Sequence, residues 1–294
     1  MRVYHISMNM SNTHISNVSS SHSSPTSTLV LGATGKTGRR VAERLNKLGM
    51  RIRLGSRSAE PRFDWEDRQT WGRALEGVGA VYISFQPDLA VPGAVHAVRS
   101  FAEQALERGV RRMVLLSGRG EEEALQAEQG IQDSGANWTI LRSSWFAQNF
   151  SESFLLEAIL NGEVALPVGE VPEPFIDVED IADAAVAALS DDKHIGQIYE
   201  VTGPRLLTFR EAVGEIAKAS GRAIRFKQVS AEQYAKSLNQ HGVPEGYVSL
   251  LIYLFTNLLD GRNAHVTDGV QRALGRQPND FANYARATSA RWNP

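Results

Sequence analysis

A glycine-rich loop is the part of this sequence best suited to chemistry: Gly32-Ala33-Thr34-Gly35-Lys36-Thr37-Gly38. It follows the apolar run 29–31 and precedes residues 39–48, whose apolar side chains have helical spacing. A strand, such a loop and a helix in this order direct free backbone N–H groups and the positive end of a helix dipole at a pyrophosphate. Glycines cluster in many turns, but a plain strand-to-helix turn needs one glycine at most. The context therefore predicts a dinucleotide-binding loop.

Each glycine of the loop has a distinct expected role. Gly32 suits a tight turn, Gly35 lets the backbone approach the phosphates, and Gly38 allows the helix to pack closely on the sheet. The residues that we expect to contact the cofactor here are Gly32, Thr34, Gly35, Lys36, Thr37 and Gly38.

The end of the second expected strand bears on the choice between NAD(H) and NADP(H). An acidic residue near this position would bind the ribose 2'-hydroxyl of NAD(H), but residues 54–58 contain no carboxylate. Arg57 has the charge and the forked geometry to bind a 2'-phosphate, and Ser56 or Ser58 could add a hydroxyl. NADP(H) is therefore favoured, with NAD(H) as the alternative. Arg57 could also be an ordinary solvated arginine.

Strands and helices alternate through the first half of the chain. Apolar runs predict strands at 29–31, 51–54, 80–85, 112–117 and 138–142, with helices at 39–48, at 91–108 and before Gly135. This alternation predicts a parallel sheet, and the aromatic segment 145–150 then follows the end of a strand, where doubly wound folds bind ligands.

The fold class predicted is α/β, a doubly wound Rossmann domain with a smaller, mostly helical C-terminal substrate lobe. We divide the chain into a Ser-rich disordered extension (1–27), a dinucleotide-binding core (28–165) and the lobe with any remaining Rossmann strand (166–294). A targeting peptide is the alternative for the extension. Capping boxes predict helix starts at Thr208 and Ser230, and further helices are expected within 242–260 and 266–284.

Composition excludes several classes of function. A formal net charge of −2 and a pI near 6.4 give no reason to expect a nucleic-acid partner. The absence of cysteine excludes disulfides, thiol nucleophiles and Cys-ligated metals. The histidines have no metal-ligand spacing, and Asp177, Glu179, Asp180 and Asp183 are typical of a helix start. No apolar run approaches the roughly 20 residues of a membrane span, so we expect a cytoplasmic protein that does not bind membranes. We expect a monomer or a homodimer, and the sequence leaves this choice open.

Five sequence blocks, in this order, resemble a known family. They are the glycine loop, Phe63-Asp64-Trp65, Val114-Leu115-Leu116-Ser117, the segment 138–150 and the segment 174–182. The chain resembles the NmrA-like, atypical short-chain dehydrogenase/reductases, in particular the branch of the ergot-alkaloid agroclavine dehydrogenases and their bacterial relatives. The resemblance runs from about Leu29 to the end of the chain. It implies a Rossmann domain that binds NAD(P) and a small-molecule substrate held between that domain and the C-terminal lobe.

The resemblance also implies roles for single residues. Asp64 would face the adenine, and Phe85, Gln86 and Pro87 would line the nicotinamide ribose. Ser117 and the segment 144–149 would flank the reactive ring, which makes Ser117, Trp145 and Asn149 the candidate residues near the nicotinamide. Asp64 could instead be a helix cap or a loop acid, and Phe85 and Trp145 could be ordinary core residues.

The proton donor of orthodox short-chain dehydrogenases is missing. The positions of its Tyr and Lys fall near Gly120 and Ala124, and neither Tyr nor Lys occurs between Tyr82 and Lys193. Two interpretations remain. The chain transfers hydride to an acceptor that needs little proton donation, such as an iminium carbon or a quinone-like or flavin-like system. Alternatively, it is a non-catalytic NmrA-like sensor of NAD(P).

Two further features bear on this choice. The acidic run 121–123 could stabilise a cationic acceptor, although such a run is usually a solvated helix start. An enzyme should also enclose a substrate pocket, whereas a sensor needs none. The aromatic residues that could line a pocket are Trp145, Phe146, Phe175, Tyr247, Tyr253 and Phe255. The apolar run 250–255 is more often core or dimer interface than a substrate wall. On balance we favour the enzyme.

Overall fold

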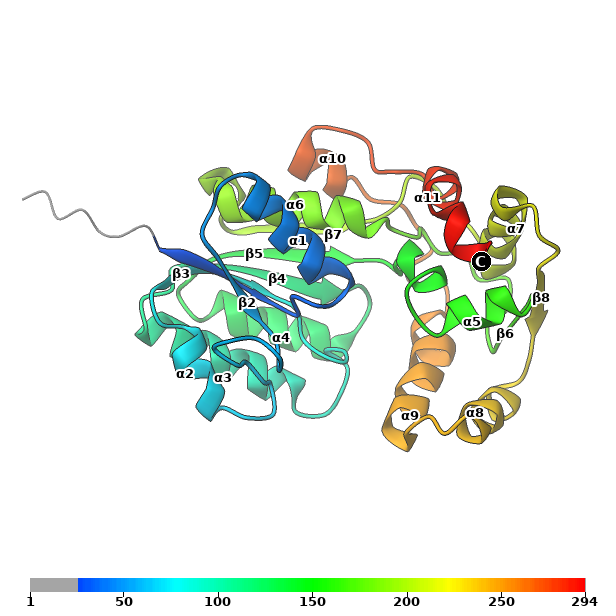
Figure 1. The fold of residues 1–294 in the computed structure, drawn as a ribbon, viewed down its shortest axis with the longest axis horizontal. Helices are drawn as coiled ribbons and strands as arrows, with labels where there is room; N and C mark the ends of the chain where they lie inside the picture. The colour runs from blue at the N-terminus through cyan, green and yellow to red at the C-terminus, as the bar shows by residue number, and fades with distance from the viewer. Residues whose placement is uncertain (1–25, 294) are drawn as a thin grey trace, which may run out of the picture.

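The computed structural model describes residues 26–293. At its centre is a six-stranded parallel sheet with the order β2-β1-β3-β4-β5-β7 (Figure 1). The strands are β1 (Ser27–Leu31), β2 (Ile52–Gly55), β3 (Val78–Ile83), β4 (Arg112–Gly118), β5 (Asn137–Ser143) and β7 (Gln197–Val201). The chain order reverses between β1 and β3, and doubly wound sheets bind ligands beyond the carboxyl ends of the strands at this point. The predicted fold class is confirmed.

Helices cover both faces of this sheet, which buries each strand on both sides (Figure 1). One face carries α1 (Lys36–Lys47), α6 (Val178–Ser190) and α10 (Gly269–Leu274), and the other carries α2 (Gln69–Ala74), α3 (Ala94–Glu107) and α4 (Glu122–Gln132). Side chains alternate along β1, so Leu29 and Leu31 enter one core and Val30 enters the other. Because both faces of β1 are buried, residues 29–31 form a continuous apolar run with no alternation of apolar and polar residues.

The smaller lobe is mostly helical and holds a two-stranded parallel sheet of β6 (Glu163–Leu166) and β8 (Arg225–Gln228). Its helices are α5 (Leu155–Leu160), α7 (Phe209–Ser220), α8 (Ala231–Gln240), α9 (Glu245–Tyr253) and α11 (Phe281–Thr288). A π-helical turn, η3 (Leu254–Leu258), extends α9. The remaining short 3₁₀ turns are η1 (Ala147–Phe150), η2 (Asp192–His194) and η4 (Ser289–Trp292).

Both predicted capping boxes are confirmed, because Thr208 and Ser230 each accept a hydrogen bond from the backbone N–H three residues on. The helices expected within 266–284 are confirmed as α10 and α11, although α11 continues to Thr288. They are separate helices because Gly275 has a φ of +70° and ends α10. The first of these helices packs against α6 and β7, and the second packs against α7.

The lobe and the sheet domain exchange segments. The core of the lobe includes Phe150 and Leu155, whereas α6, β7 and α10 return to the main sheet. Residues from both sides of the predicted boundary at 165/166 therefore contribute to the lobe and to the sheet domain. The boundary itself stays a prediction. The expected extension 1–27 lies outside the described residues except for its last two, and Ser27 already begins β1.

Within residues 26–293, no helix is both long enough and apolar enough to cross a membrane. The same part of the chain holds no group of three or more His, Asp or Glu side chains arranged to bind a metal ion. The acids at the start of α6 have the helix-start role that we expected: Asp177 is the N-cap and accepts a hydrogen bond from Glu179 N (2.9 Å).

Candidate functional site

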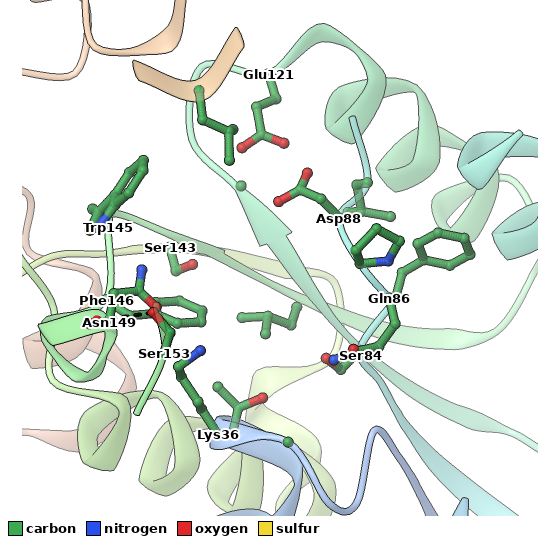
Figure 2. Close-up of a pocket in the computed structure, with 18 of the residues that line it drawn as sticks. Lys36, Ser84, Gln86, Asp88, Glu121, Ser143, Trp145, Phe146, Asn149 and Ser153 are labelled. Atoms are coloured by element: carbon green, nitrogen blue, oxygen red, sulfur yellow. Dashed lines mark hydrogen bonds between the residues drawn. The ribbon is translucent and has the colours of Figure 1, made fainter. Parts of the chain in front are cut away.

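A cavity of about 450 Å³ lies beyond the carboxyl ends of the central strands (Figure 2). The glycine loop, the segment after β3, the ends of β4 and β5, and helix α9 with η3 all contribute to its wall. The residues assigned from the sequence that line it are Thr34, Gly35, Lys36, Thr37, Phe85, Gln86, Pro87, Ser117, Trp145 and Asn149. Gly32, Gly38, Arg57 and Asp64 lie outside its lining.

The glycine loop has a backbone geometry that depends on two of its glycines. Gly32 has a φ of +64°, in the region that favours glycine, and its carbonyl accepts a hydrogen bond from Gly35 N (2.8 Å). A Cβ on Gly38 would lie 2.2 Å from the Gly32 carbonyl oxygen. Gly38 is therefore needed mainly for the approach of α1 to its own loop, which refines the expected role in helix-to-sheet packing.

The first turn of α1 presents unpaired positive groups to the cavity. Gly35 caps the helix without a side-chain hydrogen bond, and the first turn contains no acidic residue. Lys36 points into the cavity in Figure 2, and no salt bridge to it occurs within the described chain. Burial lowers the pKa of Lys36, an effect that the nearby Glu152 opposes. Free N–H groups and an unneutralised ammonium group fit the pyrophosphate of a dinucleotide.

Arg57 lies close to this loop at the edge of the sheet. Leu31 and Gly55 are register partners in β1 and β2, and Ala33 N donates a weak hydrogen bond to the Gly55 carbonyl (3.4 Å). Arg57 follows Gly55 by two residues, is exposed, and makes no salt bridge within residues 26–293. Its placement suits a ligand group bound beside the loop, and its contact with a 2'-phosphate stays a prediction.

Asp64 is held in a turn by its neighbours. Its carboxylate accepts hydrogen bonds from Arg62 (2.6 Å) and from Glu66 N (3.2 Å). Burial opposes these contacts, yet they keep the pKa of Asp64 below its ordinary value. This is the role expected of a loop acid. The adenine contact implied by the resemblance stays a prediction.

The segment after β3 lies at the edge of the cavity. The predicted strand 80–85 begins and ends earlier, at Val78 and Ile83, which frees the next residues to form a loop. Phe85 packs against Trp65 (ring centroids 4.9 Å apart) and also lines the cavity, so its core role and its site role coexist. Gln86 and Pro87 are exposed and line the cavity.

The hydroxyl of Ser117 is engaged in a buried polar network. Ser117 is 3% exposed and donates a hydrogen bond to Glu128 (2.6 Å). Glu128 also accepts from Arg142, which in turn binds Glu200 (2.9 Å). This network fixes the ends of β4 and β5 behind the cavity. Ser117 therefore positions the wall, and its hydroxyl is already donated to Glu128.

Trp145 joins the two parts of the molecule. Its backbone N–H donates to Glu173 (3.3 Å), and its ring packs against Phe255 (5.1 Å) and Phe209 (5.5 Å) in the lobe. Its indole Nε1 is buried without a hydrogen-bond partner in the described structure. The Asn149 side chain also lies at the cavity (Figure 2).

The lobe supplies an apolar wall. Of the six aromatic residues considered from the sequence, Trp145, Phe146 and Tyr247 line the cavity. Phe175 and Phe255 are instead buried in the core of the lobe, where their rings pack against another aromatic ring. Tyr253 is not among the lining residues. From the run 250–255, Leu250, Leu251 and Leu254 face the cavity, so this run is partly a cavity wall and partly core.

Sequence reasoning missed Glu173, which lies buried at the cavity. It is 3% exposed, and burial raises its pKa to about 7, although the N–H of Trp145 and the charge of Arg119 favour the ionised form. Arg119 is equally buried and donates to the carbonyl oxygens of Asn263 (3.3 Å) and His265 (3.3 Å). The only sequence signal for Glu173 was its place directly before Pro174 and Phe175.

Asp88 and Glu121 form a pair of carboxyl groups in the cavity wall. Figure 2 shows the two side chains turned toward each other, and they lie within hydrogen-bonding reach. Burial, followed by the neighbouring Asp88, raises the pKa of Glu121 to about 9. Burial likewise raises the pKa of Asp88. In the acidic run 121–123, only Glu122 is the exposed helix-start residue that we considered usual.

The two positions assigned to the orthodox Tyr and Lys have no room for these side chains. Gly120 has a φ of +76°, and a Cβ there would lie 2.7 Å from Asn263 Nδ2. Ala124 is fully buried in the core between α4 and the sheet. A larger side chain at either position would require the surrounding structure to move.

Comparisons with known proteins agree with this geometry. A family model described as NAD(P)H-binding matches residues 32–192. The chain is 33% identical over 279 residues to "Prestalk A differentiation protein A" of Dictyostelium discoideum, covering 89% of this chain and 92% of that protein. It is 29% identical over 289 residues to agroclavine dehydrogenase of Claviceps fusiformis, covering 90% and 98%.

The fold is shared with solved structures as well. The Citrobacter sp. triphenylmethane reductase, solved in complex with NADP(H), superposes with a TM-score of 0.75 at 19% identity, covering 90% of this chain and 99% of that one. Its likeness concerns the fold, whereas the family model and the relatives concern the sequence itself. Together with the glycine loop and the cavity beside it, these findings show that the chain belongs to the NAD(P)H-binding oxidoreductases of the NmrA-like, atypical short-chain dehydrogenase/reductase family.

Proposed function

We propose that this chain is an NADPH-dependent reductase that transfers hydride to a small conjugated or iminium-type organic acceptor. One observation carries the proposal: a single cavity runs from the glycine loop to the apolar wall of α9 and η3. Its volume of about 450 Å³ suits a small molecule beside a cofactor ring. A protein that only senses its cofactor needs no such apolar wall.

The cofactor's dihydronicotinamide supplies a hydride, which is a proton with two electrons. The residues that would hold the cofactor fit it: the first turn of α1 and Lys36 would bind the pyrophosphate, and Arg57 would bind the 2'-phosphate. The free guanidinium of Arg57 and the absence of an acid in residues 54–58 favour NADP(H) over NAD(H).

The acceptor would lie against the lobe. Leu250, Leu251 and Leu254 exclude water from the lobe side of the cavity, and Trp145, which packs on Phe255, adds an aromatic ring to its lining. The likeness to an agroclavine dehydrogenase and to a triphenylmethane reductase is in line with the reduction of an organic molecule. Gly120 and Ala124 leave no orthodox proton donor, which favours acceptors that polarise easily.

NADPH oxidation in the presence of quinone, enone and preformed iminium acceptors tests the proposal, together with a binding titration of NADPH. We expect turnover of at least one class and tight binding of NADPH. Tight binding without turnover of any acceptor would indicate the sensor instead. No binding would overturn both.

A further inference from the structure

We propose that Asp88 and Glu121 hold one proton between their carboxyl groups and that Glu121 donates it to the heteroatom of an uncharged acceptor. This inference rests on the proposed reductase function and adds to it the missing acid. It concerns acceptors such as quinones and enones, which gain a proton on oxygen when hydride reduces them.

The topology brings the two carboxyl groups together. Asp88 follows β3, which ends at Ile83, and Glu121 follows β4, which ends at Gly118. These strands are neighbours and parallel in the sheet, so their carboxyl ends meet at the same edge. Both residues line the cavity that Lys36 and Trp145 also line (Figure 2).

The structure gives Glu121 a special place. It is the N-cap residue of α4, yet its side chain makes no capping hydrogen bond, and it is only 6% exposed. A Cβ on Gly118 would lie 2.4 Å from Glu121 Oε1, so the carboxyl group occupies space that only a glycine leaves free. The carboxylate thus gives up its usual helix-start contact for a place in the cavity wall.

The surroundings of the pair favour a bound proton. No Lys, Arg or His side chain lies within salt-bridge distance of either carboxyl group in residues 26–293. Asp88 accepts one hydrogen bond, from Ala90 N (2.9 Å), and is therefore the member better suited to remain ionised. Because Glu121 is buried and Asp88 beside it is half-buried, ionising both carboxyl groups would be unfavourable, so they share a proton.

The other titratable groups around the pair increase its hold on the proton. Glu123 adds negative charge from the first turn of α4, and its Oε2 is buried without a partner in the described structure. Burial and the charges of the same three acids raise the pKa of Tyr253 in α9, so its hydroxyl stays neutral. Arg262, which follows the lobe helix α9 and its extension η3, is engaged by Asp260 (2.7 Å) and donates to the Gly120 carbonyl (3.2 Å). The pKa of Glu121 is raised to about 9, so the proton is present at neutral pH.

The acceptor receives a hydride from the cofactor and a proton from Glu121. The acceptor is reduced by hydride from the dihydronicotinamide, which is oxidised. The Glu121 O–H bond breaks, its electron pair stays on the carboxylate, and a new O–H bond forms on the acceptor. The pair, now doubly ionised, takes a proton from water. An iminium acceptor needs no proton, because hydride only cancels its charge.

Glu121→Gln removes the proton that Glu121 could donate and leaves the net charge of the pair unchanged. With Asp88 ionised, the wild-type pair carries one negative charge and so does the variant, in which the Gln amide can still donate to Asp88. Glu122→Gln is the matched control, because it makes the same change at the exposed neighbouring position. We expect kcat for a water-soluble quinone or enone to fall about 100-fold in Glu121→Gln, within the range for loss of a general acid. Reduction of a preformed iminium salt and the control variant should be nearly unchanged.

A second measurement does not depend on turnover. In cofactor-free full-length protein, difference infrared spectroscopy as a function of pH should show a protonated carboxylic acid that ionises well above neutral pH, and Glu121→Gln should lack it. If that variant fails to fold, Asp88→Asn replaces it and should shift the ionisation of this carboxylic acid to lower pH, because it removes the neighbouring charge and leaves the burial of Glu121.

The outcomes separate the two claims. If the wild type reduces no acceptor, the proposed function fails, and donation by Glu121 fails with it even where the infrared signal is present. If the wild type turns over a neutral acceptor and Glu121→Gln does so equally fast, the proposed function stands and the inference fails. Equal loss of kcat for the neutral and the iminium acceptor would also overturn it, as would the absence of a carboxylic acid signal above neutral pH.

Discussion

The two ends of the cavity differ in how the chain builds them. The cofactor end is made from one continuous loop, Gly32 to Gly38, and its geometry depends on contacts within that loop. The acceptor end combines Asp88, Glu121 and Trp145 with α9, which are far apart in the sequence. A site made from consecutive residues carries its own signature, whereas a site assembled by the fold does not.

The two ends also differ in charge. At the cofactor end, Lys36 makes no salt bridge within residues 26–293, and Glu152 is paired with Arg39. The carboxyl groups of Asp88, Glu121 and Glu173 lie in other parts of the wall, where Arg119 acts on Glu173. Anionic phosphate groups are therefore favoured at the end that holds Lys36. The comparison predicts that substitutions at the cofactor end change NADPH affinity, and that substitutions at the acceptor end change turnover and pH dependence.

Gly38→Ala should have the largest effect. Its Cβ would lie 2.2 Å from the Gly32 carbonyl oxygen, so the loop must move and lose hydrogen bonds to the phosphates. We expect the Kd for NADPH to rise by at least about 100-fold, since hydrogen bonds to charged groups contribute about 1.5–3 kcal/mol each. Isothermal titration calorimetry measures this. Gly214→Ala is the control, because its Cβ would meet nothing within 4 Å. An unchanged Kd in Gly38→Ala would show that the loop does not bind the phosphates.

Arg57→Ala should affect one cofactor and not the other. Loss of a charge-assisted contact to the 2'-phosphate should raise the Kd for NADPH about 10- to 100-fold and leave the Kd for NADH unchanged. Arg51→Ala is a suitable control, because Arg51 is also exposed but precedes β2 at its opposite end. Equal weakening of NADPH and NADH, or of neither, would contradict the assignment of NADP(H).

Glu121 should also make the stability of the protein depend on pH. Its pKa is about 9 in the folded protein and near its ordinary value of 4.5 in the unfolded chain. Between these values the folded state binds the extra proton, so the free energy of unfolding falls as the pH rises. We expect the Tm of Glu121→Gln relative to the wild type to increase from pH 5 to about 9. A Tm difference that does not vary with pH would contradict the shared proton, and Glu122→Gln should show none.

Ser117→Ala should have the smallest effect. The hydroxyl donates to buried Glu128, so its removal should lower the free energy of unfolding by about 1 kcal/mol. Because Glu128 keeps its contacts with Arg142, we expect kcat to change by no more than about twofold. Urea unfolding and steady-state kinetics measure the two quantities. A loss of kcat above about tenfold would instead place Ser117 among the groups that touch the substrate.

The sequence by itself determined the cofactor end. Strand β1, the loop and α1 follow from an apolar run, the glycine spacing and helical periodicity, all of which act over a few residues. The capping boxes at Thr208 and Ser230 were visible for the same reason, since their hydrogen bonds span three residues. The break between α10 and α11 was not visible in the same way, because Gly275 could have been a tolerated helix glycine and only its positive φ makes it the end of α10.

Only the tertiary structure decided the acceptor end. The pairing of Asp88 with Glu121 depends on β3 and β4 being neighbours, and Gly118 leaves the space for the carboxyl group. The hydroxyl of Ser117 turns away to Glu128, and Trp145 packs on the lobe, because long-range burial fixes each side chain. Local propensity fixes the backbone of a loop, whereas the protonation of a carboxyl group depends on what the whole fold places around it.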